Sequence, residues 1–186
     1  MTAAVAAPVR QRRTIVLVAG ILVVALLVVL AVALARGRTT EDASATALGD
    51  PTAFELPLLQ GGGTFRLVEH ADGPVFVYFW ASWCAPCAQE APVIQRLAGE
   101  YRDRGYTFVG VNIWDAEQDA RRFAEAQRLT FPLVTDPGGK TYLAYGVQTL
   151  PTAFVLRAGL QTDRKFIGAL TEAQLREMLD RAGERR

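Results

Sequence analysis

The stretch WASWCAPCAQEAP, residues 80–92, holds both cysteines of the chain, Cys84 and Cys87, with two residues between them. A disulfide across so short a loop would stabilise a fold by only about 2 kcal/mol, and 186 residues can bury a core without it. A zinc site normally needs four Cys or His ligands, and the sequence offers one histidine, His70. The spacing therefore favours a redox pair over a structural staple or a metal site.

The two cysteines lie where a buried strand is expected to pass into a helix. Residues 75–81, VFVYFWA, are continuously apolar, which is typical of a strand buried on both faces. A helix is predicted over residues 84–102, and its first turn offers unpaired N–H groups and a positive dipole end, both of which favour a thiolate. Cys84, at the corner, is the expected nucleophile. Cys87, one turn further on the same face, is the expected resolving cysteine.

The remainder of residues 51–186 alternates between strand and helix patterns. Residues 54–59 and 64–68 flank three glycines and suggest a hairpin. Residues 171–182 begin with a capping box, Thr171 to Gln174, and should form the last helix. Further strands are predicted at 106–113, 132–135, 152–157 and 164–167, and further helices at 117–128 and 140–145. This order predicts an α/β domain with a mixed sheet covered by helices on both faces.

A long apolar segment precedes this domain. Residues 14–35 carry no charge and, as a helix rising 1.5 Å per residue, would span roughly 33 Å, enough to cross a bilayer. Three arginines precede the segment, so residues 1–13 are expected in the cytoplasm and the domain outside it. Residues 36–50, small and polar, are expected to form a flexible tether. A cleaved signal peptide is the alternative, although its apolar region usually has only about 7–15 residues.

Charge and location limit the partners. The chain has 20 basic and 19 acidic side chains and no basic patch, which argues against nucleic acid as a partner. Outside the membrane, thiols tend to oxidise. A cysteine pair in that compartment either forms a permanent disulfide or needs a supply of electrons.

Residues 79–87, FWASWCAPC, and residues 149–152, TLPT, together resemble the motifs of thioredoxin-like proteins. The closer resemblance is to the membrane-anchored TlpA/ResA-like thiol-disulfide oxidoreductases, relatives of the DsbE/CcmG cytochrome c maturation proteins. Three features carry it: an N-terminal anchor and hairpin, an acidic residue three positions after the second cysteine, and a helix and strand inserted at about residues 116–136. The likeness covers about residues 51–183 and implies a thioredoxin-like fold with these additions.

The resemblance also implies roles for residues around the pair. Pro151 matches a cis proline that faces the active-site disulfide, and it would place the backbone of Leu150 beside Cys84, where an extended substrate could pair with it. Trp83 and Pro86 flank the cysteines and are assigned to substrate binding with Leu150 and Pro151. No metal is expected, and no cofactor other than the redox-active disulfide itself.

Glu90 matches an acidic residue that tunes the cysteines in reducing members of the family. It lies one turn beyond Cys87, so a partly buried carboxylate there could accept the proton of Cys87 and would raise thiol pKa values while charged. Ordinary thioredoxins carry a buried aspartate six residues before the first cysteine, and here that position is Tyr78, a poor base at neutral pH. Trp114 follows a strand end on the same side of the sheet, and the sequence leaves it open between site and packing.

The expected function is therefore that of a bacterial, membrane-tethered, extracytoplasmic thiol-disulfide oxidoreductase that reduces disulfides. The resemblance implies apocytochrome c as substrate and a membrane thiol transporter of the CcdA/DsbD kind as electron donor. A disulfide-forming oxidant or isomerase is the alternative with the same motif. A Sco-like copper module shares the fold but uses more widely spaced cysteines and a late histidine, whereas no histidine follows residue 70 here. A peroxidase and a pure binding domain fit the motif less well.

Overall fold

The computed structural model describes residues 18–29 and 53–184, and the chain divides into two compact units, residues 1–44 and 45–186. In the first unit, residues 18–29 form an α-helix whose apolar side chains are exposed. Among the described residues, no helix has the length and apolar character needed to cross a bilayer. The ends of the predicted anchor, the predicted cytoplasmic segment and the predicted tether lie outside the described residues.

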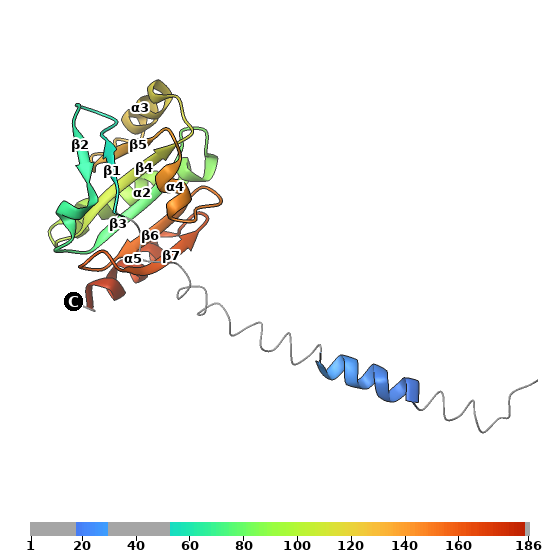
Figure 1. Ribbon diagram of the computed structural model, residues 1–186. Helices are drawn as coiled ribbons and strands as arrows, with labels where there is room; N and C mark the ends of the chain where they lie inside the picture. Colours follow the sequence, from blue (N-terminus) through green and yellow to red (C-terminus); the bar gives the residue numbers. More distant parts are fainter. Residues whose placement is uncertain (1–17, 30–52, 185–186) are drawn as a thin grey trace, which may run out of the picture. The chain divides into compact units, whose positions relative to one another are not determined.

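The second unit is built on a five-stranded sheet with the strand order β5-β4-β3-β6-β7 (Figure 1). The strands β3, β4 and β5 are parallel, β6 runs antiparallel to β3, and β7 runs antiparallel to β6. The bounds are β3 Val75–Trp80, β4 Thr107–Ile113, β5 Leu133–Asp136, β6 Thr152–Leu156 and β7 Thr162–Ile167. The predicted mixed sheet is confirmed, and β7 starts two residues earlier than predicted.

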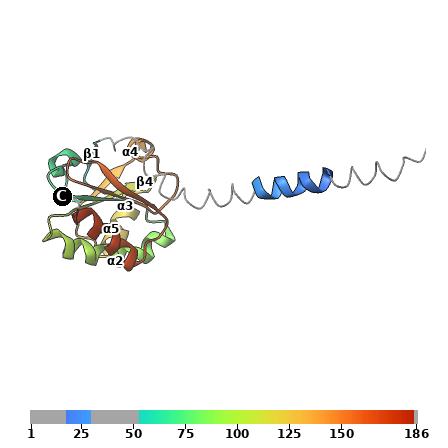
Figure 2. The ribbon, with the colours of Figure 1, turned by 90° about the horizontal axis from the view of Figure 1, so that it is seen from below.

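Helices and a hairpin cover the two faces of this sheet. Figure 2 shows α2 and α5 on one side of the sheet and β1 and α4 on the other. The bounds are β1 Glu55–Pro57, β2 Thr64–Arg66, a 3-10 helix η2 Leu67–His70, α2 Ala85–Arg102, α3 Glu117–Ala126, α4 Lys140–Ala144 and α5 Glu172–Glu184. The predicted hairpin is present as antiparallel β1 and β2, but its second strand ends at Arg66 because the chain turns into η2.

The central strand β3 sends alternate side chains into two separate hydrophobic clusters, because successive residues of a strand point to opposite faces. One cluster includes residues of α2, α3 and α5, and the other includes residues of β2, η2 and α4. The first receives Phe76, Tyr78 and Trp80, and the second receives Val75, Val77 and Phe79. Burial on both faces explains the continuous apolar run, and the alternation places Tyr78 on the α2 side.

The strand register brings three loops to one end of the sheet. Trp80, the last residue of β3, pairs with Asn112 near the end of parallel β4. Phe79 pairs with Thr152, the first residue of antiparallel β6. The segment after β3, the segment after β4 and the segment before β6 therefore meet where the cysteine motif begins.

Candidate active site

Cys84 and Cys87 form a disulfide at the start of α2, with their Cα atoms 5.2 Å apart. Cys84 is the N-cap residue of the helix, and its Sγ accepts a hydrogen bond of 3.2 Å from the backbone N–H of Cys87. Pro86 sits in the first turn, where a missing N–H leaves no helical bond unmade. The predicted position of the pair at a strand-to-helix junction is thus confirmed.

The two sulfurs differ in access. Cys84 retains 4% exposure and lines a groove of about 390 Å³, whereas Cys87 is fully buried beneath it. The groove is lined by Trp83, Cys84, Ala85, Pro86, Trp114, Tyr142, Gln148, Thr149 and Leu150. A substrate that enters this groove therefore meets Cys84 before Cys87, as expected if Cys84 is the nucleophile.

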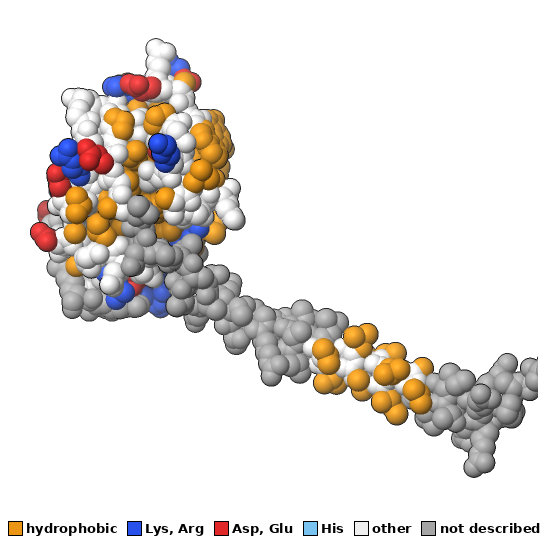
Figure 3. Space-filling view, in the orientation of Figure 1, with side chains coloured by type: hydrophobic (Ala, Val, Ile, Leu, Met, Phe, Trp, Pro, Cys, Tyr) orange, Lys and Arg blue, Asp and Glu red, His pale blue; other side chains and the backbone are white. Residues whose placement is uncertain are grey.

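Substrate-binding residues proposed from the sequence gather around this groove. The Leu150–Pro151 peptide bond is cis, as predicted, and Leu150 lines the groove together with Trp83 and Pro86. Pro151, the next residue, is buried. Figure 3 shows hydrophobic side chains gathered on the flank of the domain that carries the amino end of α2 and the short helix α4.

A carboxylate that the sequence reasoning missed ties the loop after β3 to the loop after β4. Asp115 accepts hydrogen bonds from the backbone N–H of Ser82 (2.5 Å), from the Ser82 hydroxyl (2.7 Å) and from the side-chain amide of Asn112 (2.9 Å). The residue after Ser82 and the residue before Asp115 are joined as well: the indole N–H of Trp83 donates to the backbone carbonyl of Trp114 at 3.0 Å. These bonds fix the segment that leads into Cys84. The partners that join the two loops lie more than thirty residues apart in sequence, so no local signal could have paired them.

Glu90, one helical turn after Cys87 on α2, is buried with 4% exposure, which is deeper than predicted. Its Oε2 accepts a hydrogen bond of 2.7 Å from the backbone N–H of Leu170, in the segment before α5. Burial raises the pKa of Glu90 from 4.5 to about 7. The Leu170 amide and the Tyr78 hydroxyl favour the charged form and oppose that shift only in part. A carboxyl with such a pKa can hold or release a proton near neutral pH.

Tyr78 stands beside this carboxyl, on the same side of the sheet. Burial, and then the neighbouring Glu90 carboxylate, raise the pKa of Tyr78 well above its ordinary value, so the phenol stays protonated at neutral pH. The Tyr78 hydroxyl and Glu90 Oε1 are both buried, and apart from their interaction with each other neither has a hydrogen-bond partner among the described residues. Tyr78 is thus a neutral neighbour of the carboxyl and cannot replace the thioredoxin aspartate as a base.

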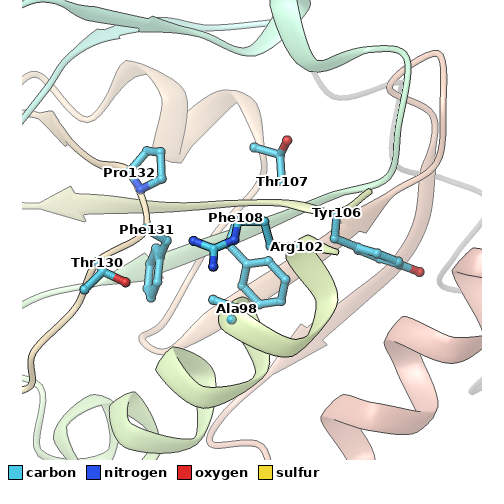
Figure 4. Close-up of a pocket in the computed structure, with 9 residues that line it drawn as sticks. Ala98, Arg102, Tyr106, Thr107, Phe108, Thr130, Phe131 and Pro132 are labelled. Atoms are coloured by element: carbon cyan, nitrogen blue, oxygen red, sulfur yellow. The ribbon is translucent and has the colours of Figure 1, made fainter. Parts of the chain in front are cut away.

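A second hollow, of about 240 Å³, lies at the other end of the sheet (Figure 4). It is formed by Ala98, Gly99 and Arg102 of α2 and by two segments, residues 106–108 and 130–132. Thr107 pairs with Val75, the first residue of β3, whereas the cysteines follow the last residue of that strand. This hollow is therefore remote from the disulfide.

Comparison with known proteins matches this site to an enzyme family. The profile of the AhpC/TSA family matches residues 49–161, which include the disulfide and the cis proline. The chain belongs to the AhpC/TSA family. Its relatives include the thiol-disulfide oxidoreductase ResA of Halalkalibacterium halodurans, 32% identical over 64% of this chain and 68% of the relative. ResA of Geobacillus thermodenitrificans is 31% identical over 75% of this chain and 80% of the relative.

A solved structure agrees with these relatives. A Chlorobium tepidum protein assigned as the thiol:disulfide interchange protein DsbE superposes with a TM-score of 0.68 at 28% identity, over 72% of this chain and 95% of the other. Within the AhpC/TSA family, this chain is a thiol-disulfide oxidoreductase of the ResA/DsbE type. The resemblance expected from the cysteine motif is confirmed.

Proposed function

We propose that this oxidoreductase works as a reductase of disulfides in exported proteins, with apocytochrome c as the substrate that its family resemblance favours. The observation that carries the proposal is the buried Glu90 carboxyl, one helical turn after Cys87 on α2, with a pKa of about 7. When charged, this group disfavours a second negative charge on the neighbouring thiols. A strong disulfide oxidant depends on a stabilised reduced form. Destabilising the thiolates therefore moves the pair toward the reducing side.

The proposed reaction follows from the positions of the two sulfurs. In the reduced enzyme, the Cys84 thiolate attacks one sulfur of the substrate disulfide from the groove, and the other substrate sulfur leaves as a thiolate. The Glu90 carboxylate takes the proton of Cys87, whose thiolate attacks Cys84 and releases the second substrate sulfur. The substrate gains two electrons from the cysteine pair and two protons, one handed on from Glu90 and one from the solvent that took up the proton of Cys84. It ends as two thiols, and the enzyme ends as the disulfide.

Continued turnover needs electrons from outside the domain. A membrane thiol transporter of the CcdA/DsbD kind would supply them by reducing the Cys84–Cys87 disulfide. We place the enzyme at the bacterial cell membrane, held by residues 14–35, with its N-terminus cytoplasmic and its catalytic domain outside. The absence of charge in that segment and the arginines before it support this placement.

The redox potential tests the direction. Equilibrating the full-length protein with glutathione buffers should give a value near the roughly −270 mV of thioredoxin, far from the roughly −120 mV of DsbA. A value above about −180 mV would exclude the reducing role and favour the oxidant or isomerase alternative.

Protease protection in spheroplasts tests the location. Protease added outside should remove the domain and leave a short membrane fragment. Domain recovered intact in the cytoplasmic fraction, or free of the membrane, would overturn the placement.

A further inference from the structure

Two tryptophans stand exposed at the rim of the groove that contains Cys84. Trp83 keeps 60% of its surface in solvent and Trp114 keeps 56%. Tryptophan is highly buried on average in folded proteins. Two exposed indoles beside one reactive sulfur therefore call for a functional explanation.

The rim formed by these indoles is fixed in place. The Trp83 indole N–H is bonded to the Trp114 carbonyl, and Asp115 holds the adjacent loop residue Ser82 through two hydrogen bonds. The Trp114 ring also packs against Tyr142 of α4, with 4.5 Å between ring centroids. The surface is thus organised before any substrate arrives, which lowers the entropy cost of binding.

Trp114 adopts a backbone conformation that disfavours large side chains. Its φ is +48°, in the left-handed region where bulky residues are uncommon because the conformation is strained. Gly139 makes room for the indole, since a Cβ at that position would lie 3.1 Å from the Trp114 Nε1. Surrounding contacts hold this residue in an unfavourable conformation while its ring stays exposed. Such strain tends to persist at sites of function.

The groove itself is uncharged. None of the described residues that line it is acidic or basic. A charged substrate side chain would lose water there without gaining an opposite charge, which is costly. An aromatic side chain could instead stack on the indoles, a contact that stabilises the complex beyond the apolar area it buries.

We propose that Trp114, together with Trp83, forms an aromatic clamp that selects polypeptide disulfides with an aromatic residue next to the attacked cysteine. The clamp rests on the proposed function, because it requires Cys84 to attack a substrate lying in this groove. It adds to that function a specificity-determining residue and the chemical class of the preferred sequence.

Three matched peptides test the clamp with the full-length protein in detergent. Each contains one internal disulfide and differs only in the residue flanking its cysteines, which is Phe, Ala or Asp. With dithiothreitol as the electron supply, the Phe peptide should exceed the Ala peptide in kcat/KM by about 10-fold, mainly through a lower KM. The Asp peptide should be the poorest. In Trp114→Ala the Phe-to-Ala ratio should fall below about 2-fold, whereas Trp114→Phe should keep most of it.

Val68→Ala, which shortens an exposed apolar side chain of η2 outside the groove, is the matched control and should keep the parent ratio. Equal rates for the three peptides with the parent protein would overturn the clamp, and so would a Phe preference that survives in Trp114→Ala. Reduction of a small disulfide such as hydroxyethyl disulfide distinguishes a failure of the clamp from a failure of the proposed reductase function. If the parent reduces it without any peptide preference, the clamp alone fails. If the parent reduces no disulfide, the proposed function fails and the clamp with it.

Discussion

Glu90 Oε2 accepts a hydrogen bond of 2.7 Å from the backbone N–H of Leu170, which lies 80 residues later in the chain. This bond joins the helix that carries both cysteines to the segment that leads into α5. It also gives the buried Glu90 carboxylate a hydrogen-bond donor, which favours its charged form. The behaviour of the enzyme with pH should therefore depend on this one side chain.

The parent protein should lose stability as pH rises toward and above neutral, because Glu90 ionises, and Glu90→Gln should not show this loss. The folded-state pKa, about 7, is higher than the ordinary 4.5, so between these values the folded protein binds more protons than the unfolded chain. The free energy of unfolding of the parent should then decrease as pH rises from 4.5 through 7, by about 3 kcal/mol at most. In Glu90→Gln this component should be absent, because the amide cannot ionise but can still accept from Leu170.

Urea unfolding of the oxidised protein at several pH values measures this difference. Glu172→Gln, at an exposed carboxylate paired with Arg96, is the control. This variant should keep the decrease in the free energy of unfolding that the parent shows between pH 4.5 and 7. Parallel stability curves for the parent and Glu90→Gln across this range would contradict the proposed ionisation of Glu90.

Tyr78→Phe should raise the pKa of Glu90 further. The Tyr78 hydroxyl favours the charged carboxylate, so its removal should shift the Glu90 titration to higher pH while the ring continues to fill its place in the core. Titration of the carboxyl carbon by ¹³C NMR would follow the change. Tyr145→Phe removes another buried hydroxyl, one that has no hydrogen-bond partner in the described part of the chain and lies on the opposite face of the sheet, and should leave Glu90 unchanged. An unshifted titration in Tyr78→Phe would show that the two groups do not interact.

Asp115→Ala should destabilise the domain by about 2 kcal/mol, because the donors of Ser82 and Asn112 lose a charged acceptor in a partly buried site. Asp119→Ala breaks only a surface ion pair with Arg122 and should cost less than about 1 kcal/mol. Chemical denaturation of both variants gives the comparison. If the two variants lost the same small amount, the contacts of Asp115 would not hold the loops together.

Cys87→Ser should trap substrates on Cys84. The variant retains Cys84, the sulfur that lines the groove, and lacks the fully buried Cys87 that would release the bound polypeptide. Mixed disulfides recovered from cells under non-reducing conditions can be identified by mass spectrometry, with Cys84→Ser as the negative control. Equal trapping by Cys87→Ser and Cys84→Ser would contradict the assignment of Cys84 as the attacking cysteine. A trapped set without haem-binding cysteine pairs would argue against apocytochrome c.

Local sequence patterns predicted much of this molecule. The apolar run of β3, the helix that starts at the cysteines and the capping box of Thr171 and Gln174 are all governed by neighbours in the chain, and all three are present. The family resemblance further predicted the cis Leu150–Pro151 bond.

The features that were missed depend on the register of distant strands. Asp115 meets Ser82 only because parallel β3 and β4 end together, and Leu170 meets Glu90 only because α5 packs beside α2. Trp114 could not be assigned from sequence because a composition pattern reveals neither its left-handed backbone nor its exposed ring.

The uncharged lining of the groove has a consequence for the rate of encounter. Because no described residue that lines the groove is acidic or basic, the groove itself gives a substrate no electrostatic steering toward the sulfur. Exchange should then vary little with ionic strength, and discrimination between substrates should lie in their residence time on the enzyme rather than in how often they collide with it.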